Sequence, residues 1–589
     1  MFTAPTLASL PYHRRNRNFF GFSLSAACAV FAFSASSTCG AAESPDRLVS
    51  FLQGEVQRNF SELRKQDSLP PYFIAYRVHD SDAVSFSANK GGVIRDRRQS
   101  SRTMSVEARV GNSVFDNTHP LRENLDFTQW TGYQNVPWPL EDNPEYWRKS
   151  LRVATDYAYR AARDEYAKIY ANVGVRPPVG DTGLDFAPAA PVHFSLSESE
   201  STTHLPTREA LDSLYARILR ASTLFSNDPH LYASQIDFNY GTVRKRFVST
   251  EGSSIEDKET LASISIYVET KADDGMILWL FKDFHFRAPP VDFSEDTLTA
   301  AVRLLMARLD TLRSAPVMET YAGPVILENI AAGVFVHEVF GHRVEGHRQK
   351  AVDEGQTFIS KVGQTLTDSS VSIVDDPTEA VFGKTALNGY YRFDDEGVPS
   401  RRTLLMENGI FRGFLFGRSV ISPQGVSNGH GRANLGLPVV ARMGNTMLSS
   451  KRGIPFATLR DSLLALLREQ GKPFGLILHD ISGGFTYTTR DLPQSFRVEP
   501  LYVTRVFADG RPDDVVRGVD AVGTPLASLA QIVATGDDPA VFNGHCGAES
   551  GWVPVSAVSP SLLLRSMEFE SRAKDQNLPP LLAPPRRSP

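Results

Sequence analysis

The sequence has few cysteines, no long run of charge of one sign and no solenoid-type repeat. Only three of its 589 residues are cysteines, and its net charge of −5 comes from acidic and basic residues that are interspersed. This balance does not favour a general attraction to nucleic acid, so we expect no nucleic-acid partner. Beyond the N-terminus, no segment has 18 uncharged apolar residues, so we expect no further membrane span. What remains is an ordinary globular composition, long enough for two or three domains.

The N-terminus has the layout of a secretory signal peptide. A basic cluster at residues 13–17 precedes the apolar run Phe19–Phe33, a small-residue stretch follows, and the first acid is Glu43. The run is shorter than the ~20 residues that span a bilayer, which favours a leader cleaved after Ala42 over a membrane anchor. We therefore predict export, to the periplasm. Lipid attachment at Cys39 and a twin-arginine signal match less well.

Removal of this leader leaves Cys546 as the only cysteine, because Cys28 and Cys39 lie within it. The mature chain then cannot form an internal disulfide, and a lone thiol in an oxidising compartment is exposed to oxidation. A bound metal that holds the sulfur as a thiolate would explain its presence.

Capping residues and hydrophobic periodicity divide the remaining chain into helix and strand regions. Thr207 and Ser294 are good N-caps for two helices, and a long helix is expected from about Pro144 to Asn172. We expect these regions: an N-terminal α+β domain at 43–204 with an insertion near 120–205, a helix and strand region at 205–315, a mainly β domain at 316–572, and a disordered tail at 573–589.

The segment Gly323–His347, GPVILENIAAGVFVHEVFGHRVEGH, carries the most informative pattern. Its ENIAAGVFVHEVF stretch is typical of a buried helix, yet it includes His337, Glu338 and, just beyond it, His342. Burying ionisable groups costs free energy unless they have partners, and a metal is a strong candidate. The histidines stand at i and i+5, about 140° apart on an ideal helix, so two ligands for one metal require a distorted helix. A π-bulge, or a break at Gly341, would realign them.

Cys546 and Glu338 complete a catalytic set. A catalytic zinc usually takes three protein ligands and leaves a fourth position open, and two histidines with one thiolate suit it. Glu338 directly follows His337 and is a candidate general base. A cysteine nucleophile at Cys546 with a histidine base is a weaker alternative, because it leaves Glu338 and the two spaced histidines unexplained.

Several neighbouring polar residues have simpler interpretations. Glu345 and His347 are expected beside the ligands or in solvent rather than on the metal. His430 is expected in a loop near the site, and His545 adjoins Cys546 without sharing its metal. His479 and Asp480 could form an orienting pair, but a surface location is favoured.

Taken together, these segments resemble the TldD/PmbA family of metallopeptidases. GPVILENIAAGVFVHEVFGHRVEG is similar to the family's metal helix, and SNGHGRAN and ARMGNTML resemble its Gly-rich loop and Arg-Met-x-Asn-Thr segment. ISGGFTYTTRDLPQSFRV and CGAESGWVPVSAVSPSLLL resemble the downstream strand region and the cysteine segment, in the family's order. The resemblance is strong over residues 317–570.

The resemblance implies an α+β, multi-domain fold with large antiparallel sheets and a C-terminal, mainly β domain that carries the metal-binding helix. It implies Zn²⁺ bound by His337, His342 and Cys546, with Glu338 as base. It also implies short or unfolded peptide substrates and a homodimer or a heterodimer with a paralogue. This sequence departs from the family in two features: its predicted leader, since members are commonly cytoplasmic, and the predicted insertion near 120–205. Two alternatives remain, a catalytically inactive partner subunit and a non-hydrolytic metal-binding protein of the cell envelope.

Overall fold

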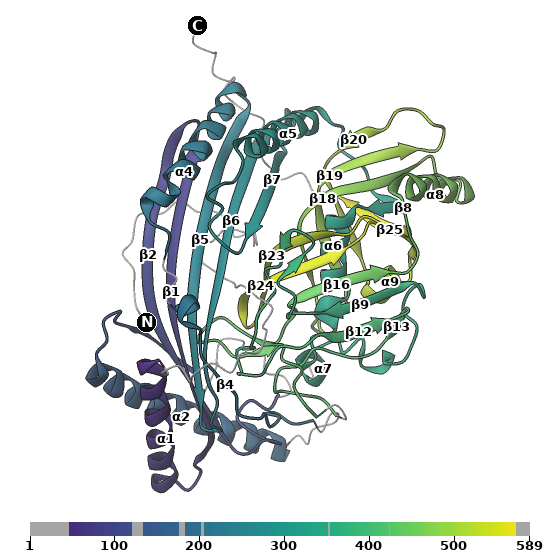
Figure 1. Ribbon diagram of the computed structural model, residues 1–589. Helices are drawn as coiled ribbons and strands as arrows, with labels where there is room; N and C mark the ends of the chain where they lie inside the picture. Colours follow the sequence, from purple (N-terminus) through teal and green to yellow (C-terminus); the bar gives the residue numbers. More distant parts are fainter. Residues whose placement is uncertain are drawn as a thin grey trace, which may run out of the picture.

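The computed structural model describes residues 46–120, 133–175, 183–201, 205–351, 354–422 and 425–572. The predicted leader and C-terminal tail lie outside these residues. Among the described helices, none is long and apolar enough to cross a membrane. The fold is α+β with a C-terminal domain of mostly strands, as expected. The rest of the described chain forms one region, a long sheet with helices (Figure 1).

A seven-stranded sheet forms the N-terminal region. Its strand order is β3-β2-β1-β5-β6-β4, with β7 also paired to β6. Every pairing is antiparallel except that of β4 with β6. The strands are β1 (Pro71–Asn89), β2 (Gly92–Val110), β3 (Tyr133–Trp138), β4 (His193–Phe194), β5 (Leu231–Ser249), β6 (Ser254–Lys271) and β7 (Ile277–Phe286).

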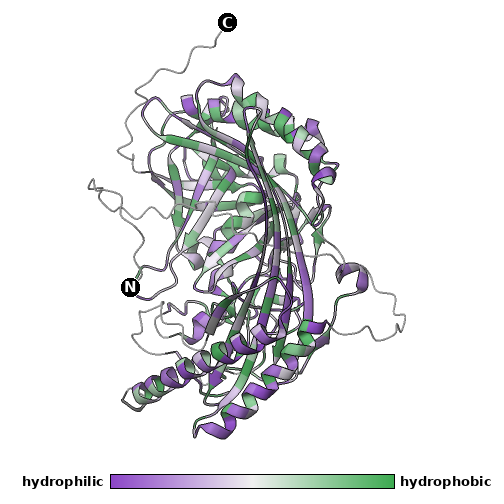
Figure 2. Ribbon diagram, turned by 90° about the vertical axis from the view of Figure 1, so that its left-hand side faces the viewer, coloured by the Kyte–Doolittle hydropathy of each residue, from purple (hydrophilic) through white to green (hydrophobic). Residues whose placement is uncertain are grey.

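Helices cover one face of this sheet at both ends (Figure 2). Side chains alternate between faces along a strand, so the even-numbered residues of β1 point to one side. There Tyr76 joins the core beneath α1 and α2, and Phe86 stacks on Tyr215 of α4 with ring centroids 4.0 Å apart. The covering helices are α1 (Arg47–Gln66), α2 (Pro144–Val175), α4 (Arg208–Ser222) and α5 (Glu295–Ser314).

The boundary that we expected near residue 205 does not separate two sheets. β1, from the range 43–204, pairs with β5, from the range 205–315, over 14 registered positions from Ala75 to Ala88. The two ranges therefore share one sheet and one set of covering helices. Local patterns do not encode which distant strands pair, so this joining could not be read from them.

The C-terminal domain contains two main sheets. One has the order β13-β12-β9-β16-β24-β23, and the other β17-β22-β25-β21-β19-β18-β8 with β20 beside β19. The first comprises β9 (Val371–Asp375), β12 (Thr403–Glu407), β13 (Ile410–Phe411), β16 (Asn445–Ser450), β23 (Ala540–Ala548) and β24 (Gly551–Ser559). The second comprises β8 (Tyr321–Leu327), β17 (Gly453–Ile454), β18 (Phe474–Thr486), β19 (Phe496–Phe507), β20 (Asp514–Val516), β21 (Val519–Gly523), β22 (Ile532–Gly536) and β25 (Leu562–Ser571).

Helix α6 (Asn329–Val339) is packed between these sheets (Figure 1). A Cβ on Gly333 would lie 3.2 Å from the carbonyl oxygen of Ala557 in β24, so the helix lies directly on that strand. On its other side, Phe335 meets Phe496 of β19 edge-on at 5.8 Å. A helix that is apolar all round needs this enclosure. Two short helices, α7 (His347–Lys350) and α9 (Pro525–Leu529), and the longer α8 (Phe456–Glu469) also belong to the domain.

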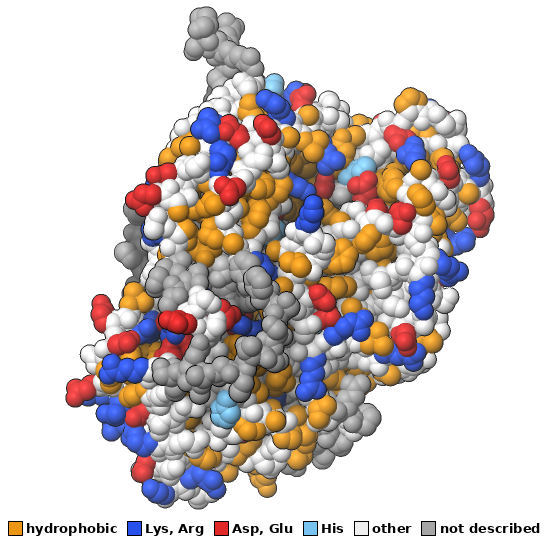
Figure 3. Space-filling view, viewed as in Figure 1, with side chains coloured by type: hydrophobic (Ala, Val, Ile, Leu, Met, Phe, Trp, Pro, Cys, Tyr) orange, Lys and Arg blue, Asp and Glu red, His pale blue; other side chains and the backbone are white. Residues whose placement is uncertain are grey.

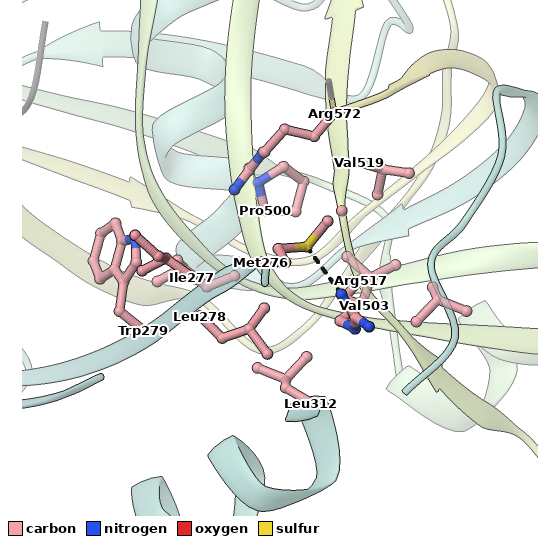
Figure 4. Close-up of a pocket in the computed structure, with 13 residues that line it drawn as sticks. Met276, Ile277, Leu278, Trp279, Leu312, Pro500, Val503, Arg517, Val519 and Arg572 are labelled. Carbon is pink, nitrogen blue, oxygen red and sulfur yellow. Dashed lines mark hydrogen bonds between the residues drawn. The ribbon is translucent and has the colours of Figure 1, made fainter. Parts of the chain in front are cut away.

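The two regions are joined by mixed polar and apolar contacts. At one end, a small pocket lies between Met276 of the β6–β7 turn and Arg517 before β21, whose guanidinium donates to the Met276 sulfur at 3.2 Å (Figure 4). At the other, Arg77 of β1 donates to the backbone oxygen of Asp395 at 2.8 Å. On the face shown in Figure 3, basic and acidic side chains are interspersed.

Candidate metal centre

The segment that carries the candidate ligands leaves the α-helix between the two histidines. Helix α6 ends at Val339, and a 3-10 turn, Gly341–Arg343, follows. We predicted a distorted helix here; the distortion is this break and not a π-bulge. The imidazole rings of His337 and His342 are nearly perpendicular, and their centroids lie 5.0 Å apart. A Cβ on Gly341 would overlap the sulfur of Met443, which is why a glycine suits the turn.

Three ligand atoms from two distant segments converge at this break. Cys546 Sγ lies 3.2 Å from His337 Nε2 and 3.4 Å from His342 Nε2, and the three atoms all lie within 4.8 Å of one another. Tetrahedral zinc with a Zn–S bond of ~2.3 Å and a Zn–N bond of ~2.05 Å would separate sulfur from nitrogen by about 3.6 Å. The donor set therefore suits a zinc ion, and the two sulfur–nitrogen distances are within a few tenths of an ångström of those in such a site.

All the candidate residues are buried. His337 and His342 are each 7% exposed, Glu338 and Cys546 each 5%. Cys546 comes from β23, the outermost strand of its sheet, and points inward, whereas its neighbour His545 lies on the opposite face and is exposed. Adjacent strand residues face opposite ways, so His545 does not join the cluster.

Glu338 is the group beside the ligands that has no firm partner. Its Oε2 is buried without a hydrogen bond among the described residues and lies 4.0 Å from His342 Nε2. Gly484 of β18 packs against it so closely that a Cβ there would lie 2.6 Å from Glu338 Cγ. A buried carboxylate oxygen left open at a ligand cluster is what an acid–base role requires.

The electrostatics of the cluster favour a thiolate. Although burial opposes ionisation, His342, Arg442 and His337 hold the pKa of Cys546 well below its usual range. Burial likewise opposes a charge on His342, but Cys546 and Glu345 raise the pKa of His342 well above its usual value. Burial raises the pKa of Glu338. A thiolate is the form that binds a metal, so the protein environment prepares the sulfur for that role.

The other polar residues singled out in the sequence have partners of their own. Glu345 accepts from His342 Nδ1 at 3.0 Å, and His347 pairs with Glu549 instead of joining the ligands. His430 is fully buried and contacts Asp375 at 3.2 Å. His479 and Asp480 do not pair with each other: the first contacts Glu328 and Thr504, and the second forms an ion pair with Arg308.

The sequence reasoning missed two arginines and one glycine that line the centre. Arg442 donates to the backbone oxygen of Cys546 at 2.7 Å, Arg343 anchors the end of β18, and Gly484 packs on Glu338. All three lie in segments that carried the family resemblance, and that was the signal by which they could have been found.

Comparisons with known proteins point to a family of metallopeptidases. Residues 320–571 match the family model described as the PmbA/TldA metallopeptidase C-terminal domain. A metalloprotease of Methanothermobacter thermautotrophicus is 28% identical over 54% of this chain and 66% of its own length. A TldD homologue of Haemophilus influenzae is 30% identical over 41% of this chain and 46% of its own. The chain thus spans about half to two thirds of the length of such relatives.

The fold also agrees over most of the chain. The crystal structure of TldE from Thermococcus kodakarensis superposes with a TM-score of 0.57, at 13% identity, over 88% of this chain and all of that one. The fold is thus that of TldE, and residues 320–571, which hold the clustered histidines and cysteine, match the C-terminal domain of the PmbA/TldA metallopeptidases.

Proposed function

We propose that the protein is a zinc-dependent peptidase that hydrolyses short or unfolded peptides. In this proposal His337, His342 and Cys546 hold the metal, and Glu338 is the general base. The observation that carries it is the convergence of three buried ligand atoms within 4.8 Å, next to a buried carboxylate oxygen without a hydrogen-bond partner among the described residues.

Zinc is favoured by the donor set. Imidazole and thiolate together suit zinc, whereas magnesium and calcium prefer oxygen ligands. Three protein ligands leave a fourth position open, the arrangement of a catalytic rather than a structural site. A relative from Saccharolobus solfataricus, 22% identical over 64% of this chain and 82% of its own, carries the name zinc metalloprotease.

The chemistry divides between the metal and the chain. When bound, zinc supplies Lewis acidity, which polarises a peptide carbonyl and activates water near neutral pH. Glu338 then accepts the proton of the attacking water and returns it to the nitrogen of the departing amine. The raised pKa of Glu338 makes its carboxylate a better proton acceptor in the first step, and the carboxylic acid that results is the proton donor in the second.

The substrate class follows from the surroundings of the site. The ligands are almost fully buried, so a folded protein surface would not reach them. β23 is the last strand of its sheet, and among the described strands none pairs with its outer edge. An extended peptide can add to such an edge through backbone hydrogen bonds, with loose sequence preference.

We also propose that the protein acts after export, in the periplasm, and as a homodimer or a heterodimer with a paralogue. The leader pattern at residues 1–42 supports export. The family resemblance supports the dimer. N-terminal sequencing of the protein from a cell-envelope fraction tests the first, and light scattering after size exclusion tests the second.

Metal content is the first test. We expect the purified mature chain to carry about one zinc per chain, and both Cys546→Ser and His337→Ala to lose it, since three ligands are the usual complement of a catalytic zinc. Elemental analysis measures this. A wild-type chain prepared without chelators that holds no metal would instead favour the inactive-partner interpretation.

Glu338→Gln separates hydrolysis from metal storage. The amide keeps the shape of the side chain but cannot take a proton, so we expect zinc to be retained and cleavage of a fluorogenic peptide to fall by about 10²–10⁴-fold. The comparison is the zinc-loaded wild type at the same metal content. Normal cleavage by this variant would contradict the assigned base, and absence of cleavage in both proteins would favour a non-hydrolytic metal-binding role.

A further inference from the structure

We propose that Glu345 and Arg442 are positioning residues that hold His342 and Cys546 in the geometry of the metal centre before metal arrives. This inference rests on the proposed function, because it assigns roles toward the same metal. The residues form one cluster with the buried Arg348 and the partly buried Glu549, directly behind the ligands. Glu345 and Arg442 are both 0% exposed.

Glu345 fixes the orientation of His342. The Nδ1 of this imidazole lies 3.0 Å from Glu345 Oε2, while its Nε2 faces the Cys546 sulfur at 3.4 Å. A carboxylate only accepts hydrogen bonds, so it favours the ring form with the proton on Nδ1 and leaves Nε2 free as a ligand atom. Glu345 therefore selects both the ring angle and the tautomer that a metal needs.

Arg442 fixes the segment that carries Cys546. One terminal nitrogen of its guanidinium donates to the backbone oxygen of Cys546 at 2.7 Å, and the other donates to Ser550 Oγ at 2.7 Å and to the Gly551 oxygen at 3.1 Å. These groups belong to the end of β23 and the turn that leads into β24. A planar fork with several donors can hold the strand and the turn at once, which a lysine cannot.

The two positioning residues face each other. Arg442 Nε lies 3.3 Å from Glu345 Oε1, and neither atom has a hydrogen-bond partner among the described residues. Through this ion pair, the segment with His342 is tied to the segment with Cys546, although these two ligands lie 204 positions apart in the sequence. The tie is made of protein groups alone and does not require the metal.

Arg348 completes the cluster from the other side. Its guanidinium donates to Glu345 Oε2 at 2.8 Å and to Glu549 Oε2 at 3.1 Å. A buried carboxylate is retained as an anion only when cations and hydrogen bonds compensate it. Arg348 and Arg442 provide that compensation, so Glu345 is available as an acceptor for His342.

A purely structural role for these residues makes a different prediction. If the cluster only stabilises the fold, its disruption should lower thermal stability and leave metal binding unchanged. If it positions the ligands, metal affinity and ligand geometry should change in a protein that is still folded. Arg418 provides the matched control: it is also buried, at 1% exposure, and pairs with Glu251, but it contacts none of the ligands.

The test uses the full mature chain, with Glu345→Gln, Arg442→Lys and the control Arg418→Lys. Zinc affinity is measured by competition with a chelator, the Co²⁺-substituted protein is examined by visible absorption, and the metal-free protein is melted. We expect Glu345→Gln and Arg442→Lys each to weaken zinc binding by about 10–100-fold and to alter the cobalt spectrum. Arg418→Lys should lower the melting temperature and leave both metal readouts at wild-type values.

The outcomes separate this inference from the proposed function. A wild-type chain that binds no zinc overturns the proposed function. A wild type that binds zinc, with folded Glu345→Gln and Arg442→Lys that bind it equally well and give the wild-type cobalt spectrum, overturns the positioning role alone. An equal loss of affinity in Arg418→Lys overturns it as well. Should Glu345→Gln fail to fold, Arg442→Lys decides the question.

Discussion

Gly484 sets how closely β18 can approach the proposed base. A Cβ at this position would lie 2.6 Å from Glu338 Cγ and 2.8 Å from Val498 Cγ1, and a contact under 3.0 Å forces a shift. We expect Gly484→Ala to displace the Glu338 carboxylate and to lower kcat by up to about 10²-fold, the effect of misplacing a reacting group by about 1 Å. Zinc content should be unchanged, because none of the three ligands contacts Gly484.

The control for this variant is Gly54→Ala. Gly54 lies in α1 with nothing within 4 Å of its added Cβ, and alanine favours a helix over glycine. Its peptide cleavage, measured by steady-state kinetics, should match the wild type. Wild-type kcat in Gly484→Ala would mean that the carboxylate does not act from the position in which it lies.

For single residues, the sequence singled out the candidate ligands and base but not the residues that hold them in position. His337, Glu338, His342 and Cys546 could be singled out because ionisable groups in an apolar helix and a lone thiol both call for a partner. The geometry of the centre, by contrast, depends on Arg442, whose side chain looks like any other arginine in the sequence. Only the fold shows that it reaches the backbone of Cys546.

Among the elements, the hairpin of β18 and β19 forms one wall of the centre and is held by Arg343. This residue follows His342 directly, and its guanidinium donates to Thr486 Oγ1 at 2.8 Å, to the Tyr487 oxygen at 2.6 Å and to Gln494. Arg343 therefore ties the turn that carries His342 to the end of the hairpin. Loss of these bonds should loosen the wall without removing a ligand.

We expect Arg343→Met to raise KM for a peptide by about tenfold, because substrate binding must then also order a wall that Arg343 no longer holds, at a cost of ~1.4 kcal/mol. Zinc content should be retained, and limited proteolysis should cleave more readily between residues 485 and 494. Arg511→Met, an exposed arginine beyond the far end of β19, is the control and should change neither property. A fall in kcat alone, with KM unchanged, would argue that the hairpin does not contact substrate.

Helix ends were well predicted by local chemistry. Thr207 and Ser294 cap α4 and α5 as expected, because each side chain accepts a bond from a free backbone N–H of the first turn. The predicted helix from Pro144 is α2, which starts there. The form of the break after α6 could not be chosen in advance, since a π-bulge and a 3-10 turn both bring i and i+5 together. The packing of Gly341 against Met443 in a distant loop favours the turn.

For the whole molecule, the fold class was predictable and the assembly was not. The α+β class and the mainly β C-terminal domain follow from local patterns and from the resemblance. The pairing of β1 with β5, and the way in which the C-terminal domain docks on the same sheet, depend on contacts between residues more than a hundred positions apart. Arg77 and Asp395, for example, meet across 318 positions.

This junction contains two buried carboxyl groups in one loop. Asp394 accepts from the backbone N–H of Gly431, and Glu396 accepts from that of Arg418. The two carboxylates approach the same point beside Gly431. Burial raises the pKa of Glu396 to about 7, and burial together with Glu396 raises the pKa of Asp394 well above its usual range.

The stability of the whole molecule should therefore depend on pH in a defined window. A folded-state pKa above the unfolded value means that Glu396 favours folding while protonated; this contribution is full below about pH 4.5 and is lost as the pH rises to about 7. Glu396→Gln mimics the protonated form, so its melting temperature should exceed that of the wild type by a few degrees at pH 8 and match it at pH 4.5. Calorimetry at both pH values measures this, with exposed Glu319→Gln as control. A lower melting temperature for Glu396→Gln at pH 8 would show that the charged carboxylate is the form that the junction prefers.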